Sequence, residues 1–175
     1  MRRRLLLLAP LGAAALAGFG FLAMLRRMKT GEFDPRGVPT MLLGKPMPPF
    51  ALPGFASTDL SATGHGVLLN FFASWCAPCV EENPQLMALR AAGTPLWGIA
   101  YKDRPDATAA FLARHGNPFQ RIARDDAGLT AIDFGVTGVP ETFLIDPAGI
   151  VRWHFSGPLS PAIADAATSL LRKYA

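Results

Sequence analysis

The chain has 175 residues, half of them hydrophobic, with 17 Lys and Arg, 13 Asp and Glu, and two cysteines. This length fits one ordinary domain with a short additional segment. Six of the basic residues lie in residues 1–29, which contain no acidic residue, so residues 30–175 carry 11 basic and 13 acidic side chains, a net charge of −2. The positive charge therefore flanks one segment instead of forming a nucleic-acid-binding face, which excludes a DNA- or RNA-binding function.

An apolar segment occupies the N-terminal part of the sequence. Residues 5–25 carry no charged side chain, and a helix of this length spans roughly 30 Å, the thickness of a bilayer's hydrocarbon core. We expect residues 1–29 to form an uncleaved membrane anchor with basic flanks. A signal peptide cleaved after the Ala-Leu-Ala of residues 15–17 is the alternative. The arginines at 2–4 slightly outweigh the basic cluster on the far side, which places the N-terminus in the cytoplasm.

The rest of the chain divides into a tether and a folded domain. Residues 30–43 are rich in Pro and Gly and are expected to form the tether, and residues 44–175 the domain. Hydrophobic periodicity predicts strands at 66–72, 95–101, 141–146 and 150–155, and helices at 77–92, 105–116 and 160–174, the last capped by Ser160. This order predicts an α/β fold with a mixed central sheet flanked by helices.

The two cysteines, Cys76 and Cys79, lie where an expected strand meets an expected helix. A structural zinc site needs four ligands, and the three histidines are scattered without ligand spacing, so no metal site is expected. Covalent haem attachment needs a histidine directly after the second cysteine, and Val80 stands there. A disulfide across two residues closes a very small loop, so its contribution to stability is small.

A redox function explains the position of the cysteine pair. Cys76, at the start of the helix, faces unpaired backbone N–H groups and the positive end of the helix dipole, which favour a thiolate. Cys79, one turn into the helix, is placed to attack a mixed disulfide formed at Cys76 and to release the partner. The pattern predicts a redox-active disulfide with Cys76 as nucleophile and Cys79 as resolving thiol.

Several stretches resemble a known family. The "WCAPC" that follows "LLNFFAS" resembles the thioredoxin superfamily. The segments "GKPMPPF" (44–50), "GIAYKDRPD" (98–106), "GNPF" (116–119) and "GVTGVPETFLIDPAGIVRWHFSG" (135–157) resemble the thiol:disulfide interchange proteins of cytochrome c maturation, the CcmG/DsbE family. The resemblance covers roughly residues 40–175 and implies a thioredoxin-like fold.

The resemblance also implies a function and a location. Such a protein is a single-pass protein of the inner membrane with its catalytic domain in the periplasm. It is a protein-disulfide reductase that keeps the CxxCH cysteines of apocytochrome c, or of the maturation protein that holds them, reduced so that haem can be attached. It is recharged by a transmembrane electron donor of the DsbD or CcdA type, and it requires no cofactor of its own.

The resemblance assigns roles to further residues. Pro140 matches the cis-proline of the superfamily, which leaves the backbone of Val139 free to pair with a substrate strand. Glu82 and Glu141 match two acids of the family's active site, although Glu82, like Glu81, also fits a solvated helix face. Trp75 adjoins the nucleophile and is expected to line the contact surface.

Two other features concern the neighbourhood of the cysteines. Tyr101, Lys102 and Asp103 match the family's loop near the site, although a plain turn at the end of a strand fits them equally. Asn70 stands where thioredoxins often have a buried Asp that accepts a proton. Because Asn cannot titrate, proton transfer at Cys79 must use another group.

Other functions remain open at this level. A disulfide oxidase or isomerase uses the same chemistry, and acids near the sulfurs would favour the reductase because they disfavour the thiolate. A non-catalytic anchored docking module for cytochrome c maturation is a third possibility. A peroxiredoxin is excluded because Ala73 occupies the position three before Cys76 where a hydroxyl residue is expected.

Overall fold

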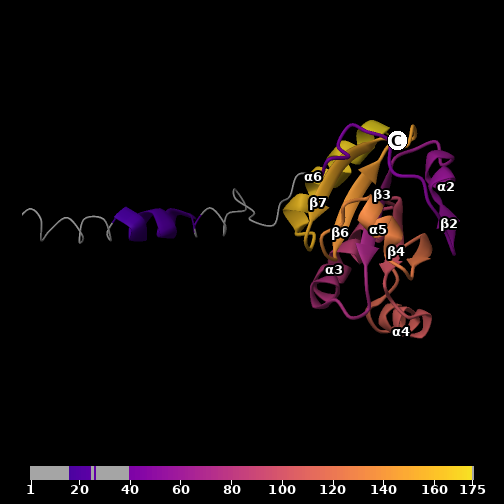
Figure 1. The fold of residues 1–175 in the computed structure, drawn as a ribbon, viewed down its shortest axis with the longest axis horizontal. Coiled ribbons are helices and arrows are strands. Elements are labelled where there is room, and N and C mark those ends of the chain that lie inside the picture. Colours follow the sequence, from indigo (N-terminus) through magenta and orange to yellow (C-terminus); the bar gives the residue numbers. More distant parts are fainter. Residues whose placement is uncertain (1–15, 25, 27–39, 175) are drawn as a thin grey trace, which may run out of the picture. The chain divides into compact units, whose positions relative to one another are not determined.

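The apolar run that follows Gly66 forms the central strand of a five-stranded mixed sheet in a computed structural model of the chain (Figure 1). This strand, β3 (Val67–Phe72), is buried along its whole length, and all of its side chains except that of Asn70 are apolar. The strand order is β5-β4-β3-β6-β7. On one side, β4 (Leu96–Tyr101) and β5 (Arg121–Asp125) run parallel to β3, and on the other, β6 (Glu141–Ile145) and β7 (Val151–Ser156) form antiparallel pairs.

The structure describes residues 16–24, 26 and 40–174. It separates into two units, Met1–Gly37 and Val38–Ala175, and each is described by itself. In the first unit residues 16–24 are helical, and none of the helices in the described part of the chain has the length and apolar character that a bilayer crossing requires. Most of the expected anchor (1–29) and tether (30–43) lies outside the described residues.

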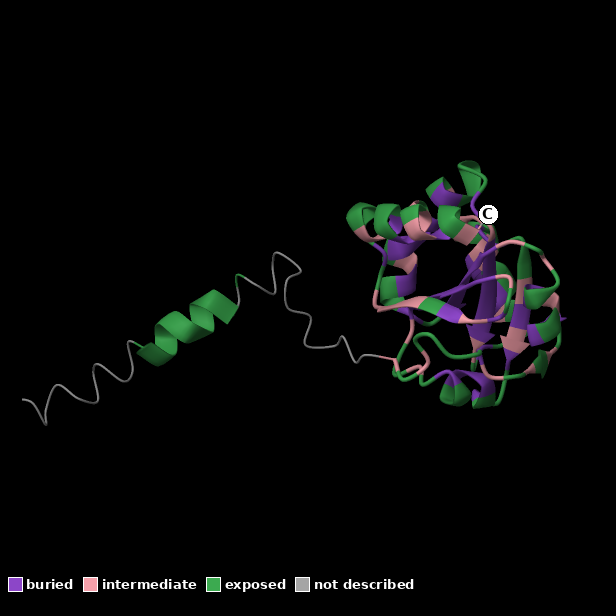
Figure 2. Cartoon of the chain, turned by 90° about the horizontal axis from the view of Figure 1, so that it is seen from above, coloured by how far each residue is buried: buried purple, intermediate pink, exposed green. Residues whose placement is uncertain are grey.

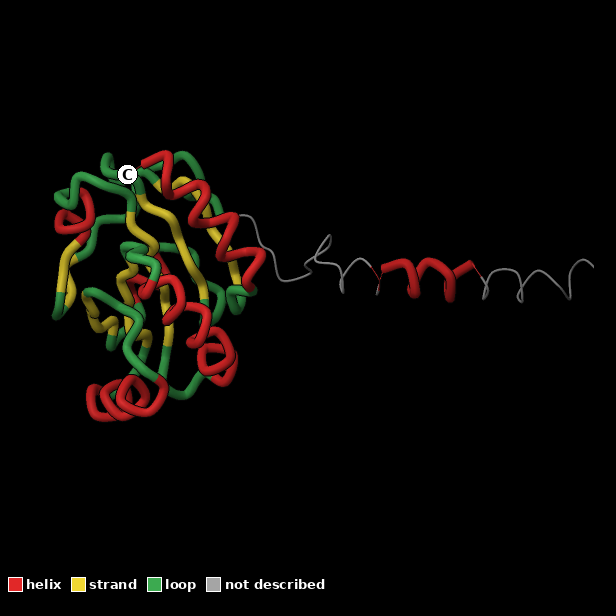
Figure 3. The backbone as a smooth tube through the Cα atoms, turned by 180° about the vertical axis from the view of Figure 1, so that it is seen from behind, coloured by secondary structure: helices red, strands yellow, loops and turns green. Residues whose placement is uncertain are grey.

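Helices and short strands cover both faces of the sheet, and Figure 2 shows the strands buried between exposed outer helix surfaces. One hydrophobic cluster joins the sheet to α3 (Ala77–Ala91), α4 (Pro105–His115) and α6 (Pro161–Leu171). The second cluster packs the other face against shorter elements, which are β1 (Ala51–Leu52), β2 (Phe55–Ala56), α2 (Ser57–Ser61) and α5 (Leu129–Asp133). Figure 3 shows the same arrangement from behind.

The predicted elements are present with small shifts at their ends. The four expected strands are β3, β4, β6 and β7, and the three expected helices are α3, α4 and α6. The Ser160 hydroxyl caps α6 by accepting a hydrogen bond from Ile163 N, as expected, but α6 ends at Leu171 and is followed by a 3-10 turn, Arg172–Tyr174. Strand β5, helices α2 and α5, and the β1–β2 hairpin were not predicted.

Candidate active site

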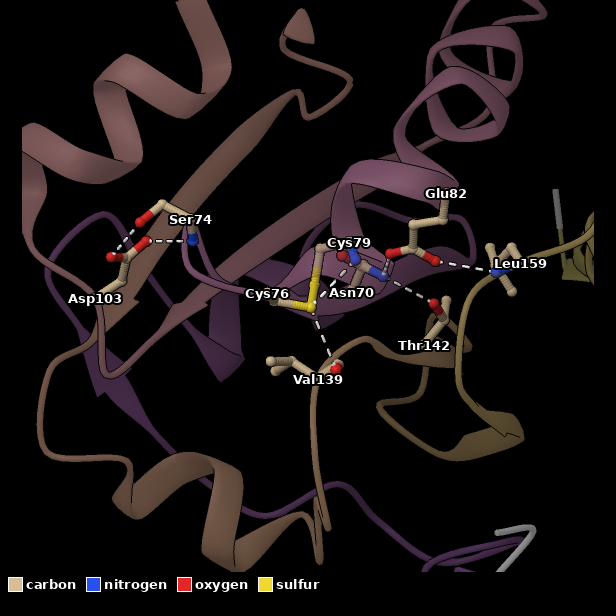
Figure 4. The surroundings of a disulfide bond; sticks show 9 residues. All are labelled: Asn70, Ser74, Cys76, Cys79, Glu82, Asp103, Val139, Thr142 and Leu159. Carbon is tan, nitrogen blue, oxygen red and sulfur yellow. Dashed lines mark hydrogen bonds between the residues drawn. A yellow bond between two sulfur atoms is a disulfide. The ribbon is translucent and has the colours of Figure 1, made fainter. Parts of the chain in front are cut away.

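The two cysteines form a disulfide at the N-terminus of α3 (Figure 4). Cys76 is the N-cap residue of this helix, with extended backbone dihedrals, and its Sγ accepts a hydrogen bond from Cys79 N at 3.1 Å. The Cα atoms of the pair are 5.3 Å apart. A backbone N–H and the helix dipole both favour negative charge at Cys76 Sγ, so this end of α3 is suited to stabilise a thiolate at Cys76.

The loop before β6 lies against the disulfide. The Val139–Pro140 peptide bond is cis, and the Val139 carbonyl oxygen is 3.3 Å from Cys76 Sγ. The loop continues into the sheet through Pro140, whose carbonyl oxygen accepts a hydrogen bond from Gly157 N at 2.8 Å. The structure therefore brings Val139 and Pro140 together with Cys76, as the sequence suggested, with backbone polar groups beside the sulfur.

Glu82 is buried on the inner face of α3, so the solvated helix face considered for it is wrong. Its side chain is 1% exposed, and it accepts hydrogen bonds from Asn70 Nδ2 and Leu159 N, each at 3.1 Å. Burial raises the pKa of Glu82 to about 7, and the bonds from Leu159 and Asn70 only partly offset this. Because Glu82 follows Cys79 by three helical positions, a group that titrates near neutral pH lies one helical turn from Cys79.

Asn70 links Glu82 to the sheet. It lies in the middle of β3, fully buried, and its Nδ2 donates to Glu82 and, at 3.0 Å, to Thr142 Oγ1 on β6. Its Oδ1 has no hydrogen-bond partner. When Glu82 gains or loses a proton, its side-chain hydrogen-bond partner is therefore the neutral amide of Asn70 and not a second acid.

Glu141 lies on the other face of the sheet. Along β6, Thr142 and Leu144 point toward the α3 side of the sheet. Glu141 and Phe143 point to the opposite side, where the second hydrophobic cluster lies. Glu141 Oε1 accepts hydrogen bonds from Thr137 N and Oγ1, both at 2.8 Å, and from Gly138 N at 3.2 Å. The two family acids thus do not form one cluster at the sulfurs, and Glu141 contacts the loop that carries Val139.

The protonation of Glu141 follows from these contacts. Burial would raise the pKa of Glu141, but the bonds from His154 and Thr137 and the charge of His154 outweigh it and hold the pKa below its usual value. His154 Nε2 lies 2.6 Å from Glu141 Oε2. Glu141 is therefore an ionised carboxylate at neutral pH, in contrast to Glu82.

The turn before Cys76 is held by a third buried carboxylate. Asp103, at the end of β4, accepts hydrogen bonds from Ser74 N and Ser74 Oγ, each at 2.7 Å, and from Thr108 Oγ1 at 2.8 Å. Trp75 is 59% exposed beside the disulfide, and its Nε1 donates to the Lys102 carbonyl oxygen at 3.2 Å. The residue 101–103 loop is thus part of the site and not a plain turn.

Four residues of this site were missed in the sequence: Ser74, Thr142, His154 and Leu159. Ser74 adjoins Trp75 and could have been found by its position, two before Cys76. Thr142, His154 and Leu159 carry no local signal, because strand pairing and a backbone N–H bring them to the acids.

Comparisons with known proteins place this geometry in a family. A family model described as the AhpC/TSA family matches residues 43–154. The chain is 39% identical to the thiol:disulfide interchange protein HelX of Rhodobacter capsulatus, over 91% of this chain and 90% of HelX. It is 38% identical to the thiol:disulfide interchange protein DsbE of Escherichia coli strain K12, over 93% of this chain and 90% of DsbE.

The fold gives the same result. A crystal structure of a DsbE-type thiol:disulfide interchange protein from Chlorobium tepidum is 31% identical, covers 75% of this chain and 96% of its own, and superimposes with a TM-score of 0.62. The central mixed sheet with its flanking helices is therefore a thioredoxin-like fold. With its Cys76–Cys79 disulfide at a helix N-terminus, the chain belongs to the CcmG/DsbE family of thiol:disulfide interchange proteins, within the AhpC/TSA family, and is a thiol:disulfide oxidoreductase.

Proposed function

We propose that this oxidoreductase works as a reductant, and that its substrate is the disulfide of a CxxCH segment in apocytochrome c or in the maturation protein that holds it. The buried carboxyl group of Glu82, one turn from Cys79, is the observation that carries the direction of electron flow. A carboxylate near the sulfurs opposes thiolate formation and so favours the disulfide over the dithiol. A protein whose disulfide is favoured passes its electrons outward.

The reaction begins with the reduced pair. The Cys76 thiolate attacks one sulfur of the substrate disulfide, the substrate S–S bond breaks, and a mixed disulfide forms with release of the other substrate sulfur as a thiolate. Cys79 then loses its proton and attacks Cys76 Sγ. The mixed disulfide breaks, Cys76–Cys79 closes, and the second substrate sulfur leaves as a thiolate. The substrate has then gained two electrons, and it becomes a dithiol by taking one proton that came from Cys79 and one from water.

Two groups of this chain serve these steps. The helix N-terminus stabilises the Cys76 thiolate through Cys79 N. Glu82, with a pKa of about 7, accepts the Cys79 proton when ionised and returns it to the leaving substrate sulfur. Asn70 cannot take this role, because its amide does not titrate at these pH values.

The cellular setting follows from the same proposal. The apolar residues 5–25 anchor the chain in the inner membrane as a single-pass protein, and the catalytic domain lies in the periplasm. A transmembrane electron donor of the DsbD or CcdA type reduces Cys76–Cys79 after each turnover. The names of the relatives support disulfide exchange in general, and the resemblance of "GVPETFLID" supports the cytochrome c assignment.

The equilibrium potential of the Cys76–Cys79 couple tests this direction. We expect a couple more reducing than glutathione when it is equilibrated against a dithiothreitol series. A potential near −120 mV, which is roughly that of a strongly oxidising periplasmic enzyme, would contradict the reductase and favour the oxidase or isomerase. Normal cytochrome c assembly by a variant with both cysteines changed to serine would instead identify a docking module.

A further inference from the structure

The loop that faces Cys76 is held from the reverse side of the sheet. Glu141 Oε1 accepts hydrogen bonds from Thr137 and Gly138, the two residues that directly precede Val139. Val139 in turn places its carbonyl oxygen 3.3 Å from Cys76 Sγ. The position of the Glu141 carboxylate therefore sets where the loop backbone lies relative to the sulfur.

His154 contacts the second carboxylate oxygen of Glu141, Oε2. On β7 it lies directly opposite Phe143, and its ring is 4.4 Å from the Phe143 ring between centroids. Its Nε2 is 2.6 Å from Glu141 Oε2, and the side chains of the two partners are 10% and 1% exposed. In a site so far removed from water, a hydrogen bond to a charged group is strong and its loss is costly.

The geometry points to His154 as a positioning residue for disulfide exchange. Through Glu141 it holds the 137–139 loop in the place where the backbone of a substrate strand meets Val139. This inference rests on the proposed function and deepens it, because it assigns to the Glu141–His154 pair an effect on substrate strand uptake and not on the sulfurs themselves. Glu141 lies on the face of the sheet opposite Asn70 and Glu82, which agrees with an action through the loop.

The test uses the full chain in its reduced form and compares the rates at which it reduces two disulfide substrates. One is an oxidised Cys-x-x-Cys-His peptide, long enough to pair with the loop backbone, and the other is hydroxyethyl disulfide, too small to do so. For His154→Ala we expect the ratio of the peptide rate (kcat/KM) to the small-disulfide rate to fall about five- to tenfold, the loss expected for one charge-assisted hydrogen bond that acts through a second residue. The equilibrium potential should stay at the wild-type value.

Two further variants complete the design. His154→Gln keeps an N–H donor at a similar reach and should restore the peptide rate. His65→Ala is the matched control, because His65 contacts the Gly66 carbonyl oxygen away from this loop, and should leave the ratio at its wild-type value. If His154→Ala does not fold, Thr137→Val compared with Thr137→Ser tests the contact between Glu141 and the loop, through which His154 acts. Only the serine keeps the hydroxyl that donates to Glu141, so the valine should show the lower ratio.

The outcomes separate the two proposals. An unchanged ratio in His154→Ala, or equal ratios in the two Thr137 variants when those are used, overturns the positioning role. An equal loss with both substrates, or a shifted potential, also overturns it, because the histidine would then act on the sulfurs or on the whole fold. If the wild type reduces neither substrate, the proposed reductase fails, and the inference fails with it.

Discussion

Glu82 is a buried helical residue whose carboxyl group has a pKa of about 7, so it can be ionised near neutral pH. Its carboxyl group has lost its water but keeps two hydrogen-bond donors, Asn70 Nδ2 and Leu159 N. Burial dominates, so the folded protein binds a proton at Glu82 more tightly than the unfolded chain does. The protonation of Glu82 therefore affects stability and, in the proposed mechanism, disulfide exchange as well.

The link predicts a pH-dependent stability difference between the wild type and Glu82→Gln. The folded pKa is about 7 against 4.5 for the unfolded chain, so the stabilising effect of the proton is complete below pH 4.5 and is lost as the pH rises through 7. Over this range the oxidised wild type should lose on the order of 3 kcal/mol of unfolding free energy relative to Glu82→Gln. Urea unfolding at several pH values measures this.

Glu81 provides the control for that experiment. Its side chain is exposed on the same turn of α3, so Glu81→Gln should follow the wild-type pH curve. Parallel curves for the wild type and Glu82→Gln would show that folding does not raise the pKa of Glu82.

The two cysteines should behave differently when each is replaced. In Cys79→Ser the Cys76 thiolate still attacks, but nothing resolves the product, so a mixed disulfide with a substrate or a labelled thiol should accumulate on non-reducing gels. Cys76→Ser should trap little, because Cys79 lies one turn into α3 and lacks the N-cap position that favours a thiolate at Cys76. Trapping through Cys79 alone would reverse the assigned roles.

The sequence predicted the chemistry of individual residues better than their surroundings. Cys76 and Cys79 were found from their spacing and from the strand-to-helix junction, which are local features. The burial of Glu82 and the opposite-face position of Glu141 could not be read, because both depend on how α3 and β6 pack. The expectation that the two acids act together on the sulfurs does not fit this placement.

At the scale of elements, Asp103 connects three segments around the site. Its carboxylate takes donors from Ser74 in the turn before α3, from Thr108 in α4 and, at 2.9 Å, from Arg104 N. Asp103→Ala removes the acceptor of all these hydrogen bonds and leaves their donors without a partner. We expect it to lower the unfolding free energy by about 2–4 kcal/mol. Slower exchange with a peptide disulfide should accompany this, because the turn that carries Trp75 loses its support.

Asp106 is the matched control for Asp103. It lies three residues further along and pairs with Arg104 in full contact with water, so Asp106→Ala should keep the wild-type unfolding midpoint and exchange rate. Equal effects of the two substitutions would show that the Asp103 contacts are not essential to the turn.

The elements that escaped prediction share a physical cause. Strand β5 reads "RIARD", which has no buried apolar run, because it is an outer strand. Helix α5 has five residues, too few to show helical periodicity, and Ala131 N is bonded to Asp125 Oδ2 at 2.8 Å. The β1–β2 hairpin has two-residue strands. Such short pieces are stable because of contacts with the rest of the fold, whereas β3 and α3 carry their own pattern.

For the whole molecule, the proposed anchor predicts a topology. A reporter that is active in the periplasm, fused at Ala175, should be active, and the mature chain should stay with the membrane at its full mass. The reason is the apolar length of residues 5–25 together with the basic residues before it. Recovery of a soluble chain that begins at Gly18 would show that the segment is a signal peptide.

The segment between the proposed tether and β3 runs along both outer strands of the sheet. Near β7, Gly44 N donates to Val151 O, and Val151 N donates to Lys45 O. Near β5, Arg124 N donates to Pro53 O, and Gly54 approaches the Ile122 backbone so closely that a Cβ would meet its oxygen at 2.1 Å. Backbone groups that are already paired cannot recruit strands of neighbouring molecules, so the positions at Val151 on β7 and Arg124 on β5 are closed to edge-to-edge pairing. In the proposed function, an incoming substrate strand meets the backbone at Val139 instead, beside the sulfur of Cys76.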